Sequence, residues 1–68
     1  MNEQLILNRI AHLLDEKDSA KFDNGQLQVY SDKNVANNIY IILCNMHRKR
    51  KVRYEVINDS EFVFKFLP

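Results

Sequence analysis

The sequence is poor in the residues that crosslink a chain or interrupt its regular structure. Its 68 residues include one cysteine, one glycine and one proline, and tryptophan is absent. A single cysteine, Cys44, excludes an internal disulfide framework, and so little glycine and proline excludes a fibrous or low-complexity chain. The one glycine lies in an Asn-Gly pair that is typical of a tight turn, so no glycine-rich loop is left to hold nucleotide phosphates.

The chain also lacks a strong net charge and a long hydrophobic run. Ten Lys and Arg residues against nine Asp and Glu residues give a net charge of +1, which is too small to steer the protein toward polyanions. The longest apolar run, residues 39–44, is far shorter than the roughly 20 residues of a membrane span. The N-terminus has no signal-peptide pattern. With 46% hydrophobic and 28% charged residues, we expect residues 1–68 to form one small, soluble, cytoplasmic domain.

Two segments carry apolar residues at helical spacing. The first runs from Asn2, a suitable N-cap, to about residue 16. The second runs from residue 33 to about Arg48, with Ser31 or Asp32 as its N-cap. Residues 39–42 are also rich in the residue types that favour strands, but a periodic pattern of about four turns favours a helix.

Two further segments have the alternation of β-hairpins. Residues 20–30 surround Asn24-Gly25, which predicts a type I′ turn. Residues 52–57 and 61–67 surround a predicted three-residue loop, which pairs Ile57 with Glu61 and places Arg53 opposite Lys65. The sequence therefore predicts an α+β fold, an α-ββ-α-ββ two-layer sandwich with two helices on one face of a four-stranded, mainly antiparallel sheet. The order of the strands stays open.

No arrangement of residues predicts catalysis or metal binding. Cys44 and His47 lie three residues apart on the second helix, but His12 is distant and a zinc site needs about four ligands. A lone cysteine is more often a small hydrophobic residue than a nucleophile. We therefore expect no catalytic residues, no metal, no cofactor, no small-molecule substrate and no enzymatic activity.

The second helix is apolar on nearly all sides. Its main apolar stripe leaves out Tyr40, Ile41 and Cys44, and several asparagines surround these three residues. A 68-residue domain has little material with which to cover both sides of such a helix. Either the first helix packs alongside and hides Ile41 and Cys44, or another chain covers them, and the small core favours another chain.

The leading hypothesis is a small protein-binding domain that associates with itself or docks on a larger protein as a regulator or inhibitor. In this interpretation the outer face of the second helix supplies the apolar contacts, and the adjacent basic run supplies charges toward an acidic partner. The predicted partner-binding residues are Tyr40, Ile41, Cys44, Arg48, Lys49 and Arg50.

The alternative is a nucleic-acid-binding domain. The segment from His47 to Arg53 holds five Lys and Arg residues in seven positions, which suits phosphate contacts, although such a run also occurs as a solvated helix end. The open face of the sheet adds the cations Lys21 and Lys65 and one aromatic ring, Tyr30, for stacking on a base. The residues predicted for this alternative are Arg48, Lys49, Arg50, Lys51, Arg53, Lys65 and Tyr30.

Overall fold

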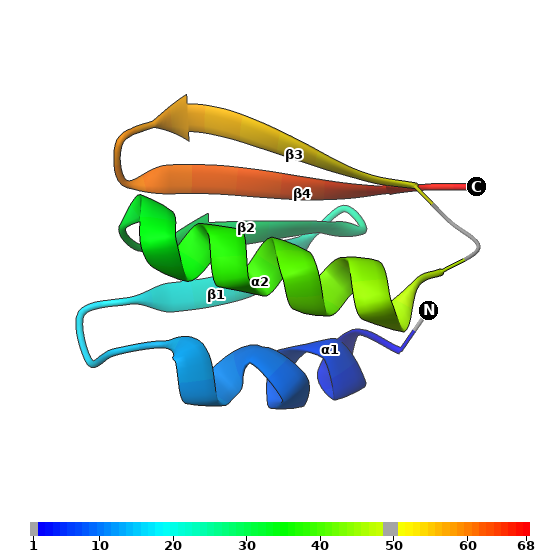
Figure 1. Ribbon diagram of the computed structural model, residues 1–68, viewed down its shortest axis with the longest axis horizontal. Helices are drawn as coiled ribbons and strands as arrows, with labels where there is room; N and C mark the ends of the chain where they lie inside the picture. The colour runs from blue at the N-terminus through cyan, green and yellow to red at the C-terminus, as the bar shows by residue number, and fades with distance from the viewer. Residues whose placement is uncertain (1, 49–50) are drawn as a thin grey trace.

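The computed structural model describes residues 2–48 and 51–68, and it confirms the α+β fold with two helices on one face of a four-stranded antiparallel sheet (Figure 1). The strand order is β1-β2-β4-β3, so the second hairpin joins the first through β4 and leaves β3 at an edge. The elements in chain order are α1 (Glu3–Ile10), the 3-10 turn η1 (Ala11–Leu13), β1 (Ser19–Asp23), β2 (Gln26–Tyr30), α2 (Lys33–Met46), β3 (Lys51–Asn58) and β4 (Glu61–Leu67).

Both helices begin at side-chain caps. The Asn2 side chain accepts a hydrogen bond from the backbone N–H of Leu5 at 3.0 Å, and the Asp32 side chain accepts one from Val35 at 2.9 Å. The helix predicted for residues 33–48 is confirmed, although it ends at Met46. The predicted extent of the first helix is wrong, because the chain tightens into η1 after Ile10 and then extends.

The first hairpin has the predicted turn and register. Asn24 and Gly25 adopt φ angles of 53° and 75°, the left-handed conformation that a type I′ turn requires at both positions. Ala20 pairs with Val29 and Phe22 pairs with Leu27, so the apolar residues of both strands share the face that the helices cover.

The loop of the second hairpin is shorter than predicted. Asn58 pairs with Glu61, so the turn is two residues long, and the register shifts between Val56 and Asn58 because Ile57 is an extra residue, a β-bulge. The reason is local: the Asn58 side chain accepts a 2.8 Å hydrogen bond from the Ser60 N–H and closes the turn early. Further along, the predicted pairing of Arg53 with Lys65 is confirmed.

The core lies between the helices and one face of the sheet. Two aromatic residues, Phe62 and Phe64, are buried at its centre on β4. Their burial against both helices fixes the helix layer over the sheet and leaves the other face of the sheet without a helical cover. No helix among the described residues is long and apolar enough to cross a membrane. The other buried members of the core are Ile6, Ile10, Leu27, Val29, Ala36, Ile39, Leu43 and Val52.

Candidate functional site

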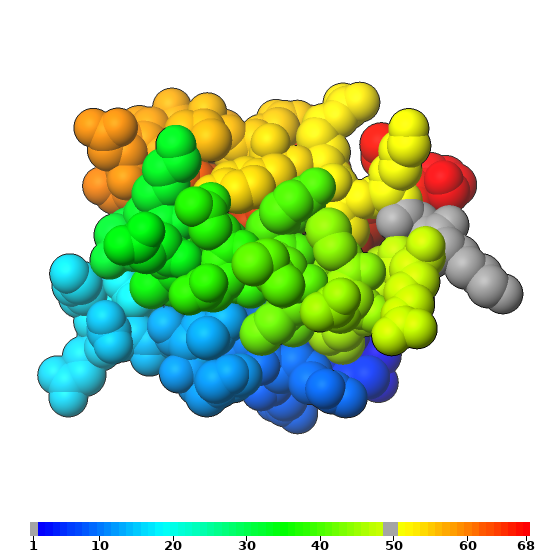
Figure 2. Space-filling model, viewed as in Figure 1, coloured from blue at the N-terminus to red at the C-terminus, as the bar shows by residue number. Residues whose placement is uncertain are grey.

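The side of α2 that points away from the core forms one continuous exposed surface. At about 100° per residue, the residues at positions −7, −4, −3, +3 and +4 from Ile41 all lie within about 60° of it around the helix axis. In Figure 2 this helix is in full view between α1 and the β3–β4 hairpin. We define the outer face of α2 as the exposed residues Asn34, Asn37, Asn38, Ile41, Cys44 and Asn45.

Ile41 is the apolar centre of the outer face of α2, and 58% of its surface is exposed. The five residues around it carry amide or thiol groups, and none of the six carries a charge. Solvent-facing helix positions ordinarily favour Lys, Glu or Ala, and asparagine costs up to about 0.7 kcal/mol per position relative to Ala. Depletion of charge around an apolar centre is instead typical of the buried centre of a protein interface.

Tyr40 lies at the border of this surface and packs inward. Its ring centroid is 5.2 Å from that of Tyr54 and 6.3 Å from that of Phe64, and the residue is half-buried. The Cys44 side chain, hydrogen-bonded to the Tyr40 hydroxyl, raises the pKa of Tyr40 above its ordinary value. Tyr40 therefore supports α2 on the sheet and leaves Ile41 and Cys44 as the outward members of the predicted partner-binding set.

A hydrogen bond ties the same side of α2 to the edge strand. The Tyr54 hydroxyl donates to Oδ1 of Asn37 at 2.9 Å, and burial raises the pKa of Tyr54. Asn37 and Cys44 therefore lie at the border of the outer face of α2 nearest to β3, and Ile41 lies at its centre.

The described residues of the basic run lie just after the end of α2 and on β3. Arg48, Lys51 and Arg53 are exposed, and the predicted residues Lys49 and Arg50 lie outside the described residues. His47 is half-buried, and its ring lies edge-on against Phe66 with the centroids 5.1 Å apart. The imidazole therefore packs on the sheet.

The open face of the sheet places Tyr30 away from the basic run. Tyr30 pairs with Glu61 and Arg53 pairs with Lys65, so the two pairs are separated by four residues of β4, about 13 Å. The Tyr30 hydroxyl points to the Glu61 carboxylate at 3.5 Å. The structure therefore brings Arg53 and Lys65 together, but it does not bring Tyr30 to them.

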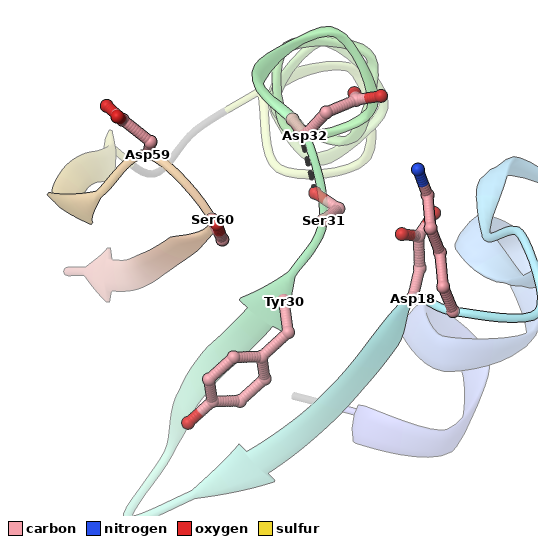
Figure 3. A pocket seen from close by; sticks show the side chains of 7 residues that line it. Asp18, Tyr30, Ser31, Asp32, Asp59 and Ser60 are labelled. Carbon is pink, nitrogen blue, oxygen red and sulfur yellow. Dashed lines mark hydrogen bonds between the residues drawn. The ribbon is translucent and has the colours of Figure 1, made fainter.

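An open pocket of about 290 Å³ lies at the end of the molecule where β2 turns into α2 (Figure 3). The backbone N–H of Ser31 donates to the Ser60 carbonyl at 3.1 Å, and the Ser31 hydroxyl donates to the Asp32 carbonyl at 2.8 Å. The first bond fastens β2 to the β3–β4 turn, and the second is local to the start of α2, so the Ser31 hydroxyl has a structural role. The residues that line this pocket come from separate segments of the chain, and no pattern in the sequence predicted that these segments would meet. The lining residues are Lys17, Asp18, Tyr30, Ser31, Asp32, Asp59 and Ser60.

Neither metal chemistry nor a known relative assigns a role to these surfaces. Within residues 2–48 and 51–68, no three His, Cys, Asp or Glu side chains come together as a set that could hold a metal ion. Comparison of the chain with known protein families, curated proteins and solved structures found no match. The function is therefore inferred from the surfaces themselves.

Proposed function

We propose that this chain is a small, non-enzymatic protein-binding domain that docks on a larger protein through the outer face of α2. The observation that carries the proposal is the 58% exposure of Ile41 at the centre of an uncharged surface rimmed by asparagine amides. Burying a branched side chain of this size contributes about 1.5–3 kcal/mol, which is enough for an anchor residue.

The surface also indicates the chemistry of its partner. Ile41 requires an apolar pocket, and the surrounding amides require hydrogen-bonding groups at the rim of that pocket. Arg48, exposed just beyond the end of the helix, favours a carboxylate on the partner. The outer face of α2 has no carboxylate to offer a second copy, so a different protein with an acidic rim suits it better.

The test compares two substitutions of exposed apolar residues by glutamate. Ile41→Glu places a charge at the centre of the outer face of α2, and Leu5→Glu makes a similar change on α1, where 49% of Leu5 is exposed. We expect Ile41→Glu to remain folded by circular dichroism and to lose at least 10-fold in recovery of partner proteins from the cells that produce the chain. Leu5→Glu should recover them at the level of the unmodified chain, and equal recovery by Ile41→Glu would contradict the proposal.

Nucleic-acid binding is the second candidate, and the exposed cations favour it. Arg53 has no carboxylate partner among the described residues, whereas Lys65 forms a 2.9 Å ion pair with Glu55. If phosphate contacts are the function, affinity for a labelled oligonucleotide falls steeply as salt rises. Absence of binding at low salt would remove this candidate.

A further inference from the structure

The edge strand β3 has no strand on its outer side within the described residues. It is eight residues long and pairs with β4 on its inner side only, and in Figure 1 it forms the outer border of the sheet. Such an edge leaves backbone N–H and C=O groups free to pair with another strand. We propose that β3 pairs antiparallel with β3 of a second copy of this chain, joining the two sheets into one. This interface is separate from the outer face of α2.

The charges of β3 are complementary to themselves. In an antiparallel pair centred on Tyr54, Arg53 of each copy lies directly opposite Glu55 of the other. Both residues are on the open face of the sheet, because Tyr54 between them pairs with the core residue Phe64 on the opposite face. Opposite charges at paired positions stabilise a sheet, so this register gains two favourable pairs by symmetry.

The surroundings of Arg53 show why a second copy fits this position. Inside its own chain Arg53 is paired with Lys65, a like charge, and Lys65 already holds Glu55 at 2.9 Å. Arg53 is exposed and has no carboxylate among the described residues. Glu55 of the second copy would supply that carboxylate on the outer side of the strand.

The other face of β3 carries apolar residues at the same positions. Val52, Tyr54 and Val56 lie on the face of the sheet that carries the helices, and 58% of Val56 is exposed. The symmetric register puts Val56 beside Val52 of the second copy and the two Tyr54 residues beside each other. Branched and aromatic residues are favourable partners across strands.

The lysine and the bulge that help to protect this edge lie at the two ends of β3. Lys51 occupies its first position, and the bulge at Ile57 disturbs its end, so residues 52–56 remain as a regular free edge. The opposite edge, β1, is five residues long. A symmetric pairing about its central residue, Lys21, would place the two lysines opposite each other, so β3 is the better edge.

The first test measures the mass of the chain in solution by light scattering between about 1 and 100 μM. We expect a concentration-dependent dimer with twice the chain mass of 8.1 kDa. In Arg53→Glu, the new carboxylate of each copy lies opposite the Glu55 carboxylate of the other copy. In Glu55→Arg, the new cation of each copy lies opposite the Arg53 cation of the other copy. Each variant alone should weaken the dimer by about 100-fold or more.

Two further samples restore the opposite charges. An equimolar mixture of Arg53→Glu and Glu55→Arg should form a heterodimer, because every glutamate then faces an arginine. The double variant with both substitutions should form a homodimer again for the same reason. Arg53→Glu also places an acid opposite Lys65, so its monomer stays folded and loss of the dimer cannot be attributed to unfolding.

Three results would overturn the proposal. The chain could stay monomeric at all concentrations, or the dimer could survive in Arg53→Glu, or the mixture could remain monomeric. A dimer lost in Ile41→Glu and retained in Arg53→Glu would likewise overturn it and would assign self-association to the outer face of α2. Partner recovery by Ile41→Glu tests the proposed function separately, since Ile41 is not on β3.

Discussion

The Tyr54 hydroxyl donates a 2.9 Å hydrogen bond to Oδ1 of Asn37 and so joins the edge strand to the helix that carries the proposed binding surface. A neutral hydrogen bond of this kind contributes about 0.5–1.5 kcal/mol. Tyr54→Phe should therefore lower the free energy of unfolding by about that amount, and Tm by several degrees. Tyr30→Phe is the matched control, because the Tyr30 hydroxyl makes a long 3.5 Å contact and its loss should change Tm less. Equal effects of the two substitutions in thermal unfolding would contradict the role of the Tyr54 hydroxyl.

The N-cap of α2 gives a second prediction. Asp32→Ala removes the acceptor for the Val35 N–H and should cost about 1 kcal/mol, which corresponds to a Tm lower by about 4–8 °C. Asn34→Ala, two residues further on, replaces an exposed asparagine with the best helix former and should leave Tm unchanged or slightly higher. Thermal unfolding followed by circular dichroism measures both, and an unchanged Tm in Asp32→Ala would show that the cap is dispensable.

The turn of the first hairpin gives a third prediction. Gly25 has a φ of 75°, and a Cβ added to it would meet no atom within 4 Å, so Gly25→Ala tests backbone conformation without a steric clash. The left-handed conformation costs a non-glycine residue about 1–2 kcal/mol, and we expect that loss in urea unfolding. Asn24→Gly keeps the same turn and should be nearly neutral. If Gly25→Ala is as stable as the unmodified chain, the turn must have another conformation.

The raised pKa values of two tyrosines predict how the free energy of unfolding changes with pH. Tyr40 and Tyr54 have pKa values above the ordinary 10.0 in the folded chain, Tyr40 through its hydrogen bond to Cys44 and Tyr54 through burial. The unfolded chain therefore releases these protons at lower pH than the folded chain. The stabilisation that results is fully present below pH 10 and declines as pH rises through the folded-state values. Urea midpoints should consequently fall above pH 10, and Tyr54→Phe should show a shallower fall than the unmodified chain.

Local patterns were sufficient to predict the elements of the fold. The Asn24-Gly25 pair determined the register of the first hairpin, and the spacing of Ile39 and Leu43 identified α2 as a helix despite its strand-like composition. The end of α1 was less predictable, because Leu13 and Leu14 keep the apolar spacing although the chain leaves the α-helical conformation. Both leucines still pack against the core from the 3-10 turn and the extended residue that follows it.

Features that depend on distant contacts could not be predicted in this way. The strand order depends on how β2 meets β4, and no local pattern records that pairing. The bulge at Ile57 depends on a hydrogen bond between the side chain of Asn58 and the backbone of Ser60. Within the candidate site, helical periodicity identified Ile41 and Cys44 as outward residues. It could not show that the Tyr40 ring packs on Tyr54, because that contact requires the position of β3.

The most direct test of the proposed function is site-specific photocrosslinking from position 41. A benzophenone amino acid at Ile41, the exposed centre of the outer face of α2, is irradiated in cells that produce the chain, with the same residue at Leu5 on α1 as the control. We predict a discrete covalent adduct with a larger protein from position 41 and none from position 5. No adduct from position 41, or the same adducts from both positions, would contradict the proposal that this face of α2 binds a protein partner.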